Sequence, residues 1–186
     1  MKHLVKGAGK ALKTVALTLI VAPGLLAMSV NKVSAGWGGG YYSCAKTPIV
    51  DVSDLTMTEG AEALGLDILA SIIPDSVAEL LDTSENITLF APTDEAFESI
   101  PTDIAAAIIG DEAILTTVLA YHVTPKKVDP RRVLYIRKLD TLAEQKLFAS
   151  RTRNEPMVNQ SNVSCEGYRT ANGLVWVIDS VLLPQF

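Results

Sequence analysis

A chain of 186 residues with 48% hydrophobic content is long enough for one well-packed domain and too short for two large ones. The formal net charge is −5, and it becomes −10 if the first 35 residues are removed, because they hold five of the sixteen basic residues and none of the acidic ones. Such an acidic chain repels phosphate backbones and anionic headgroups at long range, so we expect no nucleic-acid partner. Its one basic cluster, Lys126-Lys127 with Arg131-Arg132, is short and lacks interleaved aromatic residues.

The first 35 residues have the three parts of an export signal. Four lysines lie within the first 13 residues, an apolar run spans 16–30, and Val33-Ser34-Ala35 supplies small residues for cleavage. The apolar run is interrupted by Pro23-Gly24 and is shorter than the stretch of about 20 residues that a membrane-spanning helix needs. We therefore expect a signal peptide at 1–35, no stable membrane insertion after its cleavage, and a secreted or periplasmic protein, free or associated with the cell surface.

Residues 36–53 begin with a glycine-rich stretch, which predicts a flexible tether before a domain at 54–186. Cys44 and Cys165 are the only cysteines, and both follow the signal. Thiols pair in an oxidising compartment, so we expect a disulfide that closes a loop of about 120 residues. Two unpaired thiols and a lipid-anchored Cys44 are the alternatives.

Helices are predicted in the first part of the domain. The segment from Thr56 to Glu59 fits a capping box and opens a helix. A second box, from Ser76 to Glu79, follows Pro74 and predicts a shorter helix.

The middle of the domain predicts strand, turn and helix in quick succession. The β-rich run 86–91 is stopped by Pro92, and Thr93 is a competent N-cap for a helix over 94–97. A later helix, from Asp111 to about His122, places His122 on an apolar stripe, which predicts that this side chain points inward.

Strands follow. They are predicted around 141–149 and 157–165, and a hairpin is predicted at Asn172-Gly173, a pair that tolerates the positive φ angles of a type I′ turn. Helices first and strands later in one core predict an α+β fold.

Several segments resemble the fasciclin domain family. The run 88–97 (TLFAPTDEAF) is similar to its first signature, 172–184 (NGLVWVIDSVLLP) to its second, and Tyr121-His122 to its Tyr-His motif; lesser matches are Thr141-Leu142, Val158-Asn159 and Asn162-Val163. In family order these matches run from about Asp54 to Pro184. Two residues depart from the family pattern: Trp176 stands where His is common, and Glu144 stands where many members have Gly.

The resemblance implies a single fasciclin-like domain, a β-sandwich or wedge with a packed helical layer. It also implies a non-enzymatic role in adhesion or surface and matrix binding, with a surface protein or polysaccharide as partner; the oligomeric state is left open. Tyr121, His122 and Trp176 are the candidate partner-binding residues, although a buried, hydrogen-bonded His122 is the preferred interpretation. An apolar pocket would instead favour a second hypothesis, a soluble carrier of a small apolar ligand.

No catalytic residues, metal or cofactor are expected. Beyond the signal, His122 is the only histidine, so no multi-histidine metal site can form. A Ser-His-Asp triad would have to use this one imidazole, which lies on an apolar helix stripe. Thr93, Asp94, Asn172, Gly173 and Asp179 are expected to be structural. Asp94 lies in the first turn of a helix, where the positive end of the helix dipole stabilises its negative charge. Asp179 ends a strand, where its side chain can bond neighbouring amides.

Overall fold

The computed structural model describes residues 44–152 and 155–186. The predicted signal and the first eight residues of the predicted tether lie outside the described residues. The described helices are α2 (Met57–Ala63), α3 (Asp67–Ile72), α4 (Asp75–Thr83), α5 (Asp94–Glu98), α6 (Thr102–Gly110), α7 (Glu112–Tyr121) and the short 3-10 helix η1 (Pro130–Arg132). The described strands are β1 (Val50–Asp51), β2 (Ile87–Pro92), β3 (Val123–Thr124), β4 (Arg137–Asp140), β5 (Lys146–Thr152), β6 (Glu155–Val158), β7 (Ser161–Arg169) and β8 (Gly173–Ile178).

The strands form one mixed, eight-stranded sheet. Their order is β3-β2-β8-β7-β6-β5-β4, and β1 pairs with β7 in parallel. The long strand β7 pairs with β6 near its start and with β8 along its length, with a register shift between Val163 and Gly167. Such an irregularity bends a strand, so the sheet turns at β7 and encloses a wedge. The α+β prediction is confirmed.

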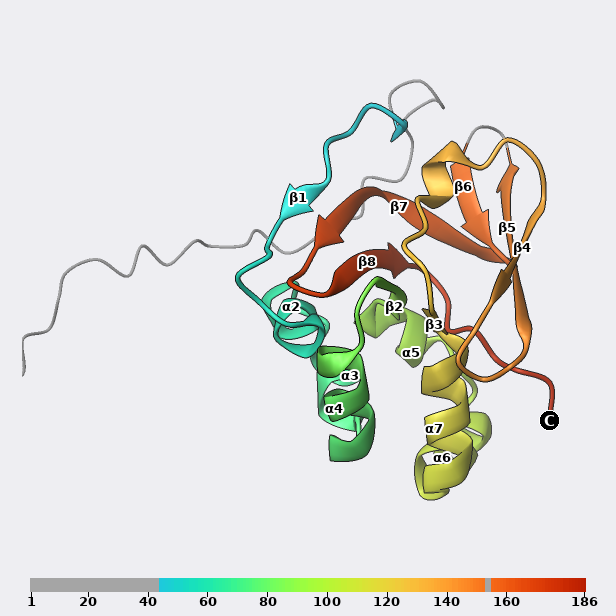
Figure 1. The fold of residues 1–186 in the computed structure, drawn as a ribbon. Coiled ribbons are helices and arrows are strands. Elements are labelled where there is room, and N and C mark those ends of the chain that lie inside the picture. The colour runs from blue at the N-terminus through green and yellow to red at the C-terminus, as the bar shows by residue number, and fades with distance from the viewer. Residues whose placement is uncertain (1–43, 153–154) are drawn as a thin grey trace, which may run out of the picture.

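Two apolar cores flank the central strand β8. Val175 and Val177 pack toward the helices, whereas Trp176 and Ile178 pack into the wedge. Alternate residues of a strand point to opposite faces, and both faces here are covered, so every residue of β8 is buried. Figure 1 shows the helices gathered on one side of β2 and β8, with β4, β5 and β6 on the other.

Side-chain caps are present at the start of α2, α5 and α7. The predicted capping box at Thr56 is present: its hydroxyl accepts a hydrogen bond from the Glu59 N–H, and the Glu59 carboxylate accepts one from the Thr56 N–H. The second predicted box is wrong, because α4 begins at Asp75 with Pro74 at its N-cap. Ser76 therefore lies inside the helix, two positions after the N-cap.

Turns occupy part of the two segments that were predicted to be continuous strands. The strand expected at 141–149 begins only at Lys146, because a turn precedes it in which Glu144 takes a φ of 60°. This conformation favours glycine, the residue that the resemblance leads one to expect at this position. The strand expected at 157–165 is a hairpin, in which Asn159 takes a φ of 52° and separates β6 from β7.

The hairpin between β7 and β8 forms, but the predicted type I′ turn is wrong. Neither Asn172 nor Gly173 is among the described residues with positive φ. The Thr170 N–H bonds to the Gly173 carbonyl, so Ala171 and Asn172 form the tip of the turn. Gly173 is instead required for space: a Cβ there would lie 2.5 Å from the Ile87 carbonyl oxygen on the neighbouring strand.

The described part of the predicted tether, residues 44–53, lies on the sheet. Its strand β1 runs beside β7, and Val50 and Val52 pack against the helical core. Cys44 is disulfide-bonded to Cys165 in β7, as predicted. Over the described residues no single helix is long and apolar enough to cross a membrane; only α6 and α7 together pass that test, and they meet at a bend of 104°.

Candidate functional site

The Tyr-His motif ends α7, and its two side chains lead to different cavities. His122 is 2% exposed, and its Nδ1 lies 2.7 Å from the Val118 carbonyl oxygen, one turn earlier. Its Nε2 accepts a hydrogen bond from the Leu182 N–H at 2.9 Å. These partners assign a neutral ring with the proton on Nδ1. The predicted inward position of His122 is confirmed.

Burial controls the titration of this ring. Desolvation lowers the pKa of His122 to about 4, against the opposing effect of its bond to Val118. Protonation would also place a second ring N–H against the Leu182 N–H, where no acceptor is available. His122 therefore joins α7 to the C-terminal segment as a neutral bridge.

Tyr121 reaches a surface groove. Its hydroxyl donates to the Lys146 carbonyl at 3.1 Å and lies 3.1 Å from the Asn159 amide nitrogen, which donates to it. The Asn159 amide oxygen in turn accepts a bond from the Phe148 N–H. Tyr121 thus holds the hairpin β5-β6 and the turn before β7 at the floor of the groove.

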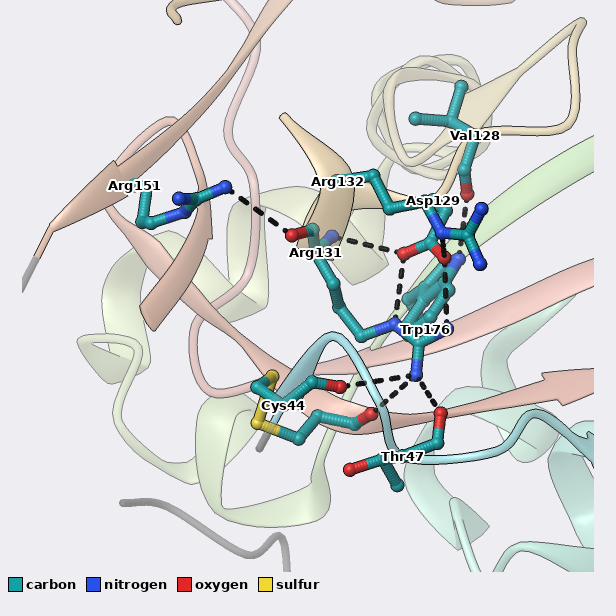
Figure 2. Close-up of polar contacts among 9 residues, drawn as sticks. Cys44, Thr47, Val128, Asp129, Arg131, Arg132, Arg151 and Trp176 are labelled. Carbon is teal, nitrogen blue, oxygen red and sulfur yellow. Dashed lines mark hydrogen bonds and ion pairs between the residues drawn. A yellow bond between two sulfur atoms is a disulfide. The ribbon is translucent and has the colours of Figure 1, made fainter. Parts of the chain in front are cut away.

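Trp176, the third candidate, is fully buried inside the wedge. Its indole N–H donates to the Val128 carbonyl at 2.9 Å, and the Arg131 guanidinium lies 4.6 Å from the ring centroid (Figure 2). A cation over an indole face is attracted to it. Gly167 makes room for the ring, because a Cβ there would lie within 2.5 Å of it. The buried Trp176 ring on β8 therefore provides the surface against which the Arg131 guanidinium packs.

Arg131 links the Trp176 ring to the N-terminal segment. Its guanidinium donates to both carboxylate oxygens of Asp129 at 2.9 Å and to the carbonyls of Thr47 and Cys165, beside the disulfide (Figure 2). The side chain is 2% exposed, and a buried arginine requires such a full set of acceptors. In the sequence, Arg131 was counted only as part of a short basic cluster; Asp129, the N-cap of η1, was the available signal for a local ion pair.

The predicted structural residues cap a helix or join separate elements. The Thr93 hydroxyl caps α5 by accepting the Ala96 N–H, and the Asp94 carboxylate accepts the Ile68 N–H from α3. The Asn172 amide donates to the Leu81 and Ser84 carbonyls at the end of α4. The Asp179 carboxylate accepts both the backbone and the side-chain N–H of Asn162, which fixes the end of β8 to β7.

An apolar pocket of about 220 Å³ opens between the helices. It lies between α3, α6 and α7, and its lining includes Leu69, Phe97, Ala105, Ile108 and His122. The nitrogen atoms of His122 are already engaged, so the ring presents mainly carbon to the pocket. The pocket is suited to a small apolar group.

A larger groove of about 1170 Å³ lies on the other side of the Tyr-His motif. Its walls come from the β4-β5 turn, the β6-β7 turn and the C-terminal segment, and they carry the amides of Gln145, Gln160 and Gln185. Phe148, 42% exposed, adds an aromatic side chain. Sequence reasoning missed this groove, because three segments far apart in the chain build it.

The described residues contain no group of three or more His, Cys, Asp or Glu side chains able to hold a metal ion. The two signature segments are buried within an α+β scaffold. Residues 65–184 match the Fasciclin domain model, and the chain belongs to the fasciclin domain family. The resemblance seen in the sequence is confirmed.

Relatives are found in mycobacteria and in animals. The chain is 28% identical to the immunogenic protein MPB70 of Mycobacterium bovis, over 94% of this chain and 98% of that one. It is 35% identical to the cell surface glycolipoprotein MPB83 of the same species, over 52% and 43% of the two chains. It is 31% identical to transforming growth factor-beta-induced protein ig-h3 of Oryctolagus cuniculus, over 63% and 17%. A solved fasciclin domain pair from the insect cell adhesion molecule Fasciclin I matches 66% of this chain with a TM-score of 0.46 and 17% identity.

Proposed function

We propose that the protein is an extracytoplasmic, non-catalytic binding module that attaches to a surface polysaccharide or protein through the groove beside Tyr121. Family membership and the similarity to a protein named as a cell surface glycolipoprotein support a surface role. A non-catalytic role is supported by His122, whose two ring nitrogens are both bonded to the backbone, which leaves it no free nitrogen to act as a base.

The lining of the groove carries this proposal. Amide side chains both donate and accept hydrogen bonds, which suits the hydroxyls of a saccharide or the backbone of an extended peptide. The side chains of Gln160 and Gln185 stand at the exposed rim, and Phe148 offers an aromatic surface beside them. Tyr121 and Asn159 are bonded to each other and keep the floor in place.

The test measures retention of the purified protein on surface polysaccharide and surface protein fractions from the producing cells, separately. We expect one fraction to bind it, and the double variant Gln160→Ala with Gln185→Ala to bind about 5- to 150-fold more weakly, since each lost hydrogen bond contributes about 0.5 to 1.5 kcal/mol. Ser76→Ala with Glu79→Ala, on the exposed face of α4, is the matched control. Binding to neither fraction would refute the function, and equal binding by the groove variant would refute the groove.

A second candidate function, the carrier of a small apolar ligand, is favoured by the pocket between the helices. An apolar cavity of about 150 Å³ is known to bind benzene, whereas sites for drug-sized ligands occupy about 300 to 1,000 Å³. The pocket here, at about 220 Å³, lies between them and suits one ring or a short alkyl chain.

Benzene tests this candidate through the melting temperature. We expect saturating benzene to raise the melting temperature of the protein, because a ligand that binds only the folded state stabilises it. Ala105→Phe, at the pocket, should abolish the rise, and Ala107→Phe, on the exposed side of α6, should keep it. A rise that survives Ala105→Phe would place the benzene elsewhere and count against the carrier.

A further inference from the structure

The connection between η1 and β4 exposes three consecutive large apolar side chains. Leu134 is 67% exposed, Tyr135 86% and Ile136 74%. These three residues are called the apolar tip below. Contiguous exposed apolar residues are uncommon on a soluble protein and mark a contact surface.

The apolar tip is held in place by its neighbours. Val133, immediately before it, and Leu139, shortly after it, are both buried in the wedge core. The Arg151 guanidinium donates to the Val133 carbonyl at 2.5 Å, and Arg131 fixes η1. The tip is therefore presented from a fixed base at the edge of the sheet, and Figure 1 shows the η1-β4 connection beside β5, away from the helices.

Basic residues flank the apolar tip in the sequence. Residues 126–138 hold six basic residues and one acidic residue, Asp129. Asp129 is shared between Arg131 and Arg132, so this trio keeps one net positive charge. The remaining cations of the segment are exposed, and they are Lys126, Lys127, Arg137 and Lys138. In the rest of the chain after residue 35, twenty acidic residues face only five basic ones, so the positive charge is concentrated in this segment.

We propose that the apolar tip docks the protein peripherally on an anionic lipid surface. Leu134, Tyr135 and Ile136 would enter the boundary between headgroups and acyl chains, while Arg132, Arg137 and Lys138 contact the phosphates. Repulsion from the acidic remainder of the protein is screened beyond about 8 Å at physiological salt, whereas the cations beside the tip lie at the headgroups.

Two other partners fit the surface less well. A standard protein interface buries about 800 Å² on each partner, far more than three side chains supply. A soluble polyanion would use the cations but would gain nothing from two exposed aliphatic side chains. Only a lipid surface uses both the charges and the apolar residues. This contact adjoins the groove, because Lys138 pairs with Phe148 across β4 and β5, but the variants that test the two surfaces share no residue.

Flotation with lipid vesicles tests the proposal. The protein should bind vesicles that contain phosphatidylglycerol at least about tenfold more tightly than vesicles of phosphatidylcholine alone, because each cation contributes about fivefold at an anionic surface. Leu134→Ser with Ile136→Ser should lower binding at least about tenfold. Leu80→Ser with Phe186→Ser, which removes two other exposed apolar residues, should leave binding unchanged.

A matched pair of variants separates local charge from net charge. Arg137→Glu with Lys138→Glu and Lys46→Glu with Arg169→Glu change the net charge equally, and all four residues are exposed. Only the first pair should lose vesicle binding. Tyr135→Trp should show a blue shift of its added fluorescence on binding, which reports entry of the tip itself.

Several outcomes would overturn the proposal. These are absence of binding to the anionic vesicles, equal binding to both lipid compositions, unchanged binding by the serine variant at the tip, and equal losses in the two charge variants. Retention on dextran sulfate that depends on the cations but not on Leu134 and Ile136, without vesicle binding, would assign a polyanion site instead. The groove variant Gln160→Ala with Gln185→Ala should still bind vesicles, so this test and the test of the groove fail independently.

Discussion

Acidification should destabilise the domain through one side chain, His122. Its ring is buried, neutral and bonded at both nitrogens, and burial lowers its pKa to about 4, whereas the unfolded chain keeps the ordinary value of about 6.5. Between these two values the unfolded state binds more protons than the folded state. Stability contributed by the neutral ring is therefore complete above about pH 6.5 and is lost as the pH falls toward 4.

The size of the effect follows from the two pKa values. One pKa unit corresponds to about 1.4 kcal/mol, so the whole window is worth about 3 kcal/mol, of which about 2 kcal/mol is lost between pH 7 and pH 5. Carboxylates also begin to titrate near the lower limit, so a reference protein without the imidazole is required.

His122→Asn supplies that reference, because its amide does not titrate. Urea unfolding of both proteins at several pH values gives the difference in the free energy of unfolding, in which the other histidine, His3, cancels. We expect the wild-type advantage to shrink by about 2 kcal/mol from pH 7 to pH 5. A difference that stays constant within a few tenths of a kcal/mol over this range would refute the neutral, buried imidazole.

Three further changes test the scaffold by the same unfolding measurement. Gly173→Ala should lower the free energy of unfolding by about 1 to 3 kcal/mol, because its Cβ would meet a backbone carbonyl of the neighbouring strand, and an unchanged midpoint would contradict that contact. Cys44→Ser with Cys165→Ser should lower the free energy of unfolding by up to about 4 to 5 kcal/mol. The same loss in the reduced wild type would assign the effect to the disulfide. Arg131→Ala should remove about 3 to 5 kcal/mol, against at most about 1 for Arg132→Ala, which removes an exposed partner of the same carboxylate; equal losses would show that burial is unimportant.

Sequence reasoning succeeded where the determining contacts are local. The capping box at Thr56 and the N-cap at Thr93 involve partners three residues away, so the printed order of residues contains the whole interaction. The inward position of His122 follows from the apolar stripe of one helix. These features need no knowledge of which elements meet.

Features that depend on distant partners were missed or misread. The turn at Asn172 differs from the local expectation, because its amide reaches two carbonyls at the end of α4, and Gly173 makes room for β2. Trp176 was a candidate for partner contact, yet β8 lies between β2 and β7 and is covered on both faces. Its uninterrupted apolar run was the available signal for a central strand.

The bond between Cys44 and Cys165 also decides how the domain would carry mechanical load. A pull that arrives through the residues before Cys44 passes through the sulfur atoms directly into β7, and if the C-terminus is held, it continues through β8. The described helices and strands β1 to β6 lie outside that path. Resistance to stretching would therefore rest on the hydrogen bonds that hold β8 to β7 and β2, and on the C-terminal segment that lines both cavities.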